Sequence, residues 1–112
     1  MLAVQNRLKK RKSFNYINRK GKRISGDLVT LVFVPARVRD VKVGFSVSKK
    51  VGNSVVRHRV TRQMRSAMRL LIDGVWRDNT MIFSAKENIV GKTMDEIRED
   101  MERVLIKAKL LG

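Results

Sequence analysis

The sequence predicts an α+β fold, and two observations about its apolar residues support this. Three β-prone runs, at residues 28–34, 41–47 and 80–85, predict the strands of a small sheet. Apolar residues recur at helical spacing in the middle of the chain and again near its C-terminal end, which predicts two amphipathic helices that pack on this sheet. With 112 residues and no internal repeat, low-complexity tract or linker, residues 1–112 are expected to form a single domain.

The chain begins with a basic, mostly polar segment, residues 1–12, which we expect to be a flexible arm that condenses on a polyanion. A short helix is predicted over residues 13–20. Ser13 is a suitable N-cap for this helix, and Gly21 is a suitable residue just beyond its C-terminus.

The first two strands are expected to pair as an antiparallel hairpin with a loop of about six residues. The run 28–34 is continuously apolar and predicts a strand buried on both faces, which Pro35 ends. The run 41–47 alternates between large apolar residues and the small or polar residues of its other face. Trp76, in the loop before the third strand, is expected to be a partly buried anchor.

The last helix is predicted to start with a capping box made by Thr93 and Glu96. Its early carboxylates, which include Asp95, Glu99 and Asp100, match the helix dipole and favour a solvated face over a metal site. The apolar stripe of this helix consists of Met94, Ile97, Met101, Val104, Leu105 and Ala108.

The middle helix, which follows Gly52 and can be capped by Asn53 or Ser54, has one apolar side and one cationic side. No acidic residue occurs between Asp40 and Asp73. The apolar side consists of Val56, Val60, Met64, Ala67 and Leu71. The opposite side consists of His58, Arg62, Arg65 and Arg69, with Arg57 and Arg59 on its flanks. Such a helix is predicted to rest on a core and to bind a polyanion.

The charge of the chain supports a polyanionic partner. The net charge is +16, with +17 on residues 1–72 and −1 on residues 73–112. RNA is the favoured partner. An anionic membrane is the second choice, because membrane binding needs free apolar side chains on a helix, and those of this chain are expected to be buried in a core. The chain has no cysteine, which excludes disulfides and thiolate chemistry and fits the cytoplasm. No run approaches the length of a membrane span, and no apolar signal segment is recognisable.

Catalytic groups are scarce in this sequence. His58 is the only histidine, so a mechanism with two histidines is impossible, and no catalytic residue or metal ligand of the protein is predicted. The protein is expected to bind rather than to catalyse with its own side chains.

The central stretch SVSKKVGNSVVRHRVTRQMR resembles the signature of the bacterial ribonuclease P protein subunit, which is approximately SVSKKxGNAVxRNRxKRxxR. The N-terminal stretch RLKKRKSFNYINRKG is similar to the basic lead of that family into a short helix that bears a Phe. Three positions depart from the family pattern: His58 replaces Asn, Thr61 replaces Lys, and Ser54 replaces a small apolar residue.

The resemblance implies an α/β sandwich in α-β-β-α-β-α order around a central sheet, usually of four strands, although only three are evident here. It also implies a left-handed βαβ crossover through the basic helix, against the general rule. The implied function is that of a subunit that joins a catalytic RNA. With Mg²⁺, this RNA removes the 5′ leader of precursor tRNA.

The resemblance further implies two binding surfaces. Phe14, Ser46 and Ser48 would line a cleft for the single-stranded leader, where Tyr16, expected to be exposed, is a further candidate to stack on a base. The RNA subunit would face Lys49, Lys50, Asn53, Arg57, Arg59, Arg62 and Arg65, and the helical pattern adds His58 and Arg69 to the same surface.

Three other interpretations fit a small basic chain without cysteine. A ribosomal or other structural RNA-binding protein would not affect tRNA 5′ ends. A DNA-binding regulator would need a helix before the basic helix, where a hairpin is predicted. An autonomous ribonuclease would cleave precursor tRNA without any added RNA.

Overall fold

The computed structural model describes residues 11–35, 41–75 and 79–111, so the predictions for residues 1–10, for the turn at 36–40 and for Trp76 lie outside the described residues. Three helices and four strands make up this part of the chain, with two short 3-10 turns at Ile72–Gly74 and Glu87–Ile89. In chain order the elements are α1 (Arg11–Lys20), β1 (Lys22–Ser25), β2 (Val29–Pro35), β3 (Val41–Ser46), α2 (Ser54–Leu71), β4 (Asn79–Ala85) and α3 (Met94–Lys107).

The four strands form one sheet in the order β1-β2-β4-β3. β2 is antiparallel to both β1 and β4, whereas β3 and β4 are parallel. The predicted hairpin between the second and third of these strands is therefore wrong, because β4 lies between them. The hairpin partner of β2 is instead β1, a strand that the sequence analysis missed. The connection from β3 through α2 to β4 joins parallel neighbours, so it is a βαβ crossover through the basic helix, as expected.

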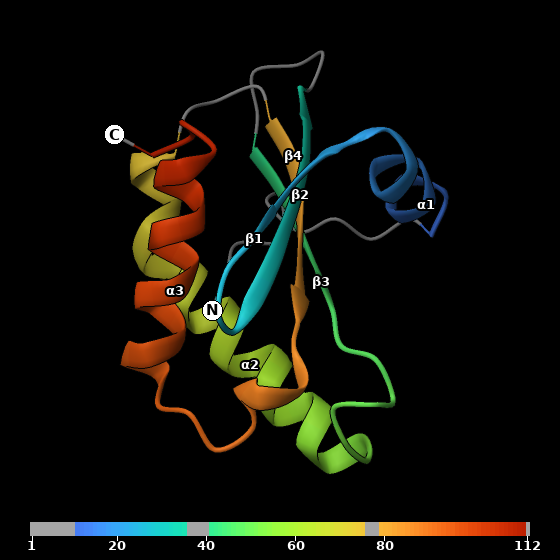
Figure 1. Ribbon diagram of the computed structural model, residues 1–112, viewed down its shortest axis with the longest axis vertical. Coiled ribbons are helices and arrows are strands. Elements are labelled where there is room, and N and C mark those ends of the chain that lie inside the picture. The colour runs from blue at the N-terminus through green and yellow to red at the C-terminus, as the bar shows by residue number, and fades with distance from the viewer. Residues whose placement is uncertain (1–10, 36–40, 76–78, 112) are drawn as a thin grey trace.

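Helices cover both faces of the sheet (Figure 1). α2 and α3 lie side by side on one face, and α1 lies on the other. Residues of β2 alternate between the two layers: Leu31 belongs to the main core beneath α2 and α3, whereas Val32 packs with Ile17 of α1 and Ile82 of β4. This alternation confirms that the strand is buried on both faces.

The start of α1 differs from the prediction, whereas its end at Lys20 agrees with it. The helix begins at Arg11, so Ser13 lies inside it and is not its N-cap. Gly21 does follow its last residue, but φ of Gly21 is not positive, so this glycine does not adopt the left-handed conformation expected of a cap. Its role is a close approach, since a Cβ atom there would lie 2.6 Å from both the Ile17 carbonyl oxygen and Val32 Cγ1.

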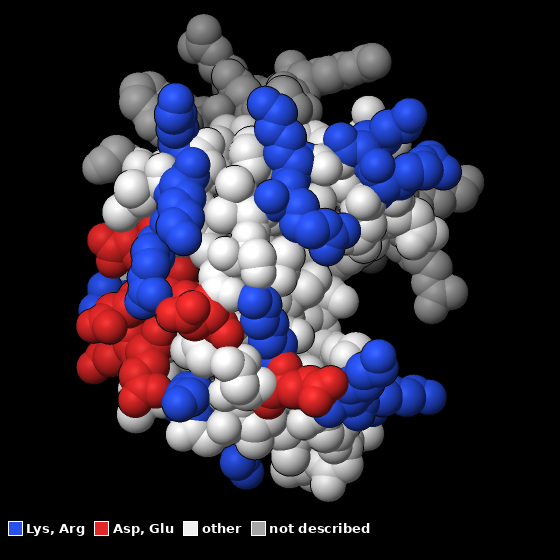
Figure 2. All heavy atoms as spheres, viewed as in Figure 1, with Lys and Arg blue, Asp and Glu red and all other residues white. Residues whose placement is uncertain are grey.

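The α3 stripe is buried from Ile97 to Leu105, and Thr93 caps the helix by accepting a hydrogen bond from the Glu96 backbone N–H at 3.2 Å. Met94 is an exception because it is 36% exposed rather than buried in the core. The acidic residues gather over α3, on the left in Figure 2.

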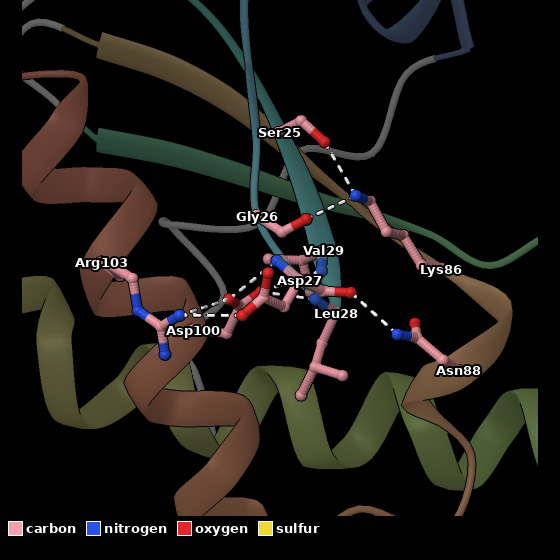
Figure 3. A network of polar contacts seen from close by, with 9 residues as sticks. All are labelled: Ser25, Gly26, Asp27, Leu28, Val29, Lys86, Asn88, Asp100 and Arg103. Atoms are coloured by element: carbon pink, nitrogen blue, oxygen red, sulfur yellow. Dashed lines mark hydrogen bonds and ion pairs between the residues drawn. The ribbon is translucent and has the colours of Figure 1, made fainter.

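The sequence predicted a solvated face that includes Asp100, but this prediction is wrong because Asp100 is buried, with only 1% of its surface exposed. Its carboxylate accepts hydrogen bonds from the backbone N–H groups of Asp27, Leu28 and Val29 at 2.9, 2.8 and 3.0 Å (Figure 3). Arg103, one turn later, donates to the Asp27 carboxylate at 2.9 Å. α3 is thereby tied to the turn between β1 and β2, which fixes the sheet against the helical layer.

Candidate RNA-binding surface

The start of α2 is built by a tight turn and a side-chain cap. Asn53 Oδ1 accepts a hydrogen bond from the Val56 backbone N–H at 3.0 Å, which confirms Asn53 as the N-cap. Gly52 has no room for a side chain, since a Cβ atom there would lie 2.9 Å from Val56 Cβ. Lys49 and Lys50 are exposed in the turn just before the cap, so they precede the cationic helix directly.

The inner side of α2 anchors the helix to the sheet. Val60 is 1% exposed and Met64 is completely buried, whereas Val56, nearer the N-terminus, is half-buried. Ala67 and Leu71 complete the buried side, as predicted. Because this side is fixed in the core, the rotation of the helix about its axis is fixed too, and so is the direction of its cations.

The outer side of α2 presents its cations to solvent. The exposed cations are Arg59, Arg62 and Arg69, and the His58 side chain is exposed beside them. Ion pairs between two described residues lie around α3: Arg98 pairs with Glu102, and Arg103 pairs with Asp27 and Asp100. None of the α2 arginines pairs with a described carboxylate, so their charges are available to an external anion.

The helical pattern predicts Arg65 on the cationic side and Arg57 on its flank, and in the structure both are half-buried. The Nε atom of each is buried and has no hydrogen-bond partner among the described residues. Arg57 Nη2 contacts Ser54 Oγ at 3.4 Å. Such desolvated donors are costly to leave without an acceptor, so both guanidinium groups favour a ligand that brings one.

Thr61 is one of the positions that depart from the resembled signature, and its side chain is used within the helix. Its hydroxyl donates to the Arg57 carbonyl oxygen at 2.9 Å. The Thr61 side chain is half-buried, and its hydrogen bond lies within α2. It contributes no charge to the outer side of this helix.

The sheet face beneath α1 carries the second predicted surface. Phe14 is half-buried and packs with Val34 against the small core of Ile17, Val32 and Ile82. Tyr16 is 52% exposed, as predicted. Phe14 is thus an apolar wall of this face, and Tyr16 is an exposed ring on α1.

A transverse row of hydroxyl residues crosses the open part of this face and was missed by the sequence analysis. Ser25 pairs with Thr30, Thr30 with Ser84, and Ser84 with the predicted Ser46, so all four strands contribute one member. The neighbouring row contains Val32 and Ile82, which α1 covers. Strand alternation was the available signal, but only the register between strands places these residues in one row.

Lys86 lies at one end of this row, and Ser48 follows two residues after Ser46, the member at the other end. The Lys86 ammonium donates to Ser25 Oγ at 2.7 Å and to the carbonyl oxygen of Gly26 (Figure 3). Ser48 is exposed in the segment that follows β3, outside the sheet. The face is therefore polar and, at the Lys86 end, cationic.

Two further findings concern the described residues. No helix among them is both long and apolar enough to cross a bilayer. Within residues 11–35, 41–75 and 79–111, no three acidic or histidine side chains come together in a way that suits a metal ion.

A rigid helix with an unpaired cationic side, on a protein of net charge +16, defines a nucleic-acid-binding protein. The family model of ribonuclease P matches residues 2–109. The chain therefore belongs to the ribonuclease P protein family, and it is a protein subunit of a tRNA-processing ribonuclease with an RNA partner.

Relatives and solved structures agree with this assignment. The chain is 35% identical to the ribonuclease P protein component of Alkaliphilus metalliredigens, over 99% of this chain and 100% of that protein. It is 31% identical to that of Caldanaerobacter subterraneus subsp. tengcongensis, over 93% and 90% of the two chains. The Staphylococcus aureus RNase P protein structure superposes with a TM-score of 0.86 at 26% identity, over 96% and 98% of the chains. The Thermotoga maritima protein, at 18% identity, shares the fold with a TM-score of 0.83, over 90% and 96% of the chains.

Proposed function

We propose that the outer side of α2 binds the ribonuclease P RNA and that the sheet face beneath α1 binds the 5′ leader of precursor tRNA. The observation that carries the first part is the set of α2 arginines without a described carboxylate partner. Phosphate oxygens would also supply the acceptors that the buried Nε atoms of Arg57 and Arg65 lack.

The second part is supported by the chemistry of the sheet face. A single strand of RNA needs groups for its backbone and apolar or aromatic surfaces for its bases. The hydroxyl row from Ser25 to Ser46 offers hydrogen-bonding groups for the RNA backbone. Tyr16 and Phe14 offer aromatic surfaces for the bases. None of these groups distinguishes one base from another, which suits leaders of varied sequence.

In this proposal the RNA subunit performs the hydrolysis of the phosphodiester, using Mg²⁺ that the RNA binds. The protein holds the RNA subunit and the precursor tRNA close together, although the negative charges of the two RNA chains repel each other. Because the described cations lie on both sides of the sheet, a single small body screens both chains. The protein is proposed to act in the cytoplasm, where precursor tRNA is made.

Reconstitution with omitted components tests the proposal. Purified protein, the ribonuclease P RNA of its own organism and precursor tRNA are combined with Mg²⁺, and each component is left out in turn. We expect 5′-leader removal to need the RNA at every Mg²⁺ concentration, and the protein to lower the Mg²⁺ concentration and the precursor concentration that cleavage requires. Cleavage by protein alone would refute the assignment of catalysis to RNA. Cleavage by RNA that the protein does not stimulate would refute the proposed role of the protein.

A further inference from the structure

A groove lies between the outer side of α2 and the start of α3, and no part of the proposed function uses its apolar walls. Its open volume is about 660 Å³, within the range of small-molecule sites. We call it the α2–α3 groove, and it is lined by Val55, His58, Arg59, Arg62, Gln63, Ser66 and Met94.

Two exposed apolar side chains line this groove, one from each helix. Val55 is 68% exposed on the otherwise cationic side of α2, and Met94, the first residue of α3, is 36% exposed. Single exposed apolar residues are ordinary, but two from different helices that line one groove form an apolar surface. A sugar–phosphate backbone alone cannot use such a surface, whereas the face of a nucleobase can.

The charges around the groove orient a bound nucleotide. The exposed guanidinium groups of Arg59 and Arg62 line the α2 side. The first turn of α3, which carries Met94, also carries the exposed carboxylates of Asp95 and Glu96. Phosphates are therefore attracted more strongly to the α2 side than to the α3 side, where these carboxylates oppose the lysine just before them and the helix N-terminus. A base attached to such phosphates would point toward Met94.

Polar groups in the groove suit the edge of a base. Gln63 Nε2 donates to the Lys92 carbonyl oxygen at 3.2 Å, which holds the carboxamide in place. Gln63 Oε1 remains as an acceptor, and the Ser66 hydroxyl lies in the same lining. An amide held this way can accept a hydrogen bond from an exocyclic amino group.

We infer that the α2–α3 groove takes one unpaired nucleobase of the RNA partner, with the adjoining phosphates on Arg59 and Arg62. The base lies between Val55 and Met94, and its edge faces Gln63. Unpaired bases of RNA can be splayed out of their stack to make such contacts. This inference rests on the proposed function, because it requires α2 to face the RNA.

The first test compares two short oligonucleotides with equal numbers of phosphates: pentaadenylate, and a pentamer with the same sugar–phosphate backbone but no bases. The readout is the methyl resonances of Val55 and Met94 in the full-length protein, observed by NMR. We expect pentaadenylate to shift both methyl signals and the abasic pentamer to leave them in place, although it binds the arginines. Unmoved methyl signals, or equal shifts with both oligonucleotides, would overturn the inference.

The second test uses variants that keep the charge of the groove. Val55→Thr and Met94→Gln remove apolar contact, and Leu70→Thr is the control because Leu70 is 61% exposed on α2 but does not line the groove. We expect each groove variant to weaken binding of the ribonuclease P RNA about fourfold, as the loss of about one buried methyl group would, with an unchanged salt dependence. The control should bind like the wild type.

The two tests separate this inference from the proposed function. If the groove variants bind as tightly as Leu70→Thr, the base site is refuted while binding by the arginines stands. If replacement of Arg59 and Arg62 also leaves binding unchanged, the proposed role of α2 fails as well.

Discussion

Asp100 ties α3 to the turn between β1 and β2, so Asp100→Asn should destabilise the protein more than any exposed acidic substitution on α3. The carboxylate is 1% exposed and accepts three backbone hydrogen bonds at 2.8–3.0 Å. An asparagine can place its single oxygen where Oδ2 accepts from Leu28 and Val29. Its amide nitrogen then faces the Asp27 N–H, so one acceptor is replaced by a donor.

The size of the effect follows from these three bonds. A hydrogen bond to a charged group contributes about 1.5–3 kcal/mol, and a neutral acceptor gives about half as much. One bond is lost and two are weakened, so we expect a loss of about 3–6 kcal/mol of unfolding free energy. Since small domains have only about 5–15 kcal/mol in total, this is a large fraction.

The assay is urea unfolding followed by circular dichroism, with Glu99→Gln as the matched control. Glu99 is the exposed neighbour on α3, and its substitution makes the same change from acid to amide and the same change in net charge. We expect the unfolding midpoint of Asp100→Asn to fall by about 2 M or more, and that of Glu99→Gln to change little. Midpoints that agree within error would show that the buried carboxylate does not stabilise this fold.

Two further substitutions test the cap of α2 and the exposed ring of α1. Asn53→Ala should cost about 1 kcal/mol, read as a lowered thermal midpoint, because it removes the 3.0 Å bond to the Val56 N–H. Ser54→Ala is the control. Equal thermal midpoints for the two variants would show that the Asn53 side chain does not stabilise α2 as its N-cap. Tyr16→Ala should weaken holoenzyme binding of precursor tRNA about tenfold through lost stacking, with no effect on leaderless tRNA. Asn15→Ala, also exposed on α1, should affect neither RNA, and an equal loss for both RNAs with Tyr16→Ala would remove Tyr16 from the leader surface.

Local patterns predicted the helices well because they depend on short-range spacing. The period of 3.6 residues places Val60 and Met64 in the core and Arg59 and Arg62 in solvent, as observed. The caps at Asn53 and Thr93 were predicted for the same reason, since each bonds a backbone N–H only three residues away.

Strand pairing was predicted poorly because it depends on contacts between distant residues. β2 and β3 are neighbours in the sequence, which favoured a hairpin, but β4 arrives after α2 and pairs with both. β1 was missed because its sequence KRIS has one apolar residue, and the strand is recognisable only through its ladder with β2. The hydroxyl row on the open face could not be seen without this register.

Asp100 was misplaced because its partners are 71–73 residues away in the chain. Its neighbours in the helical pattern, Ile97 and Val104, are both buried, so the spacing held a signal that the acidic cluster obscured. Met94 shows the opposite error, because it fits the apolar stripe but lies at the first turn of α3, beyond the sheet that the stripe covers.

The central claim, that the outer side of α2 binds RNA by charge, is tested most directly by the salt dependence of ribonuclease P RNA binding. The double variant Arg59→Gln/Arg62→Gln is compared with Lys107→Gln/Lys109→Gln, which has the same net charge but loses exposed cations at the end of α3. If each arginine neutralises one phosphate, the slope of log K against log salt should become shallower by about 1.4 for the α2 variant and stay unchanged for the control. Equal slopes for the two variants would contradict the account.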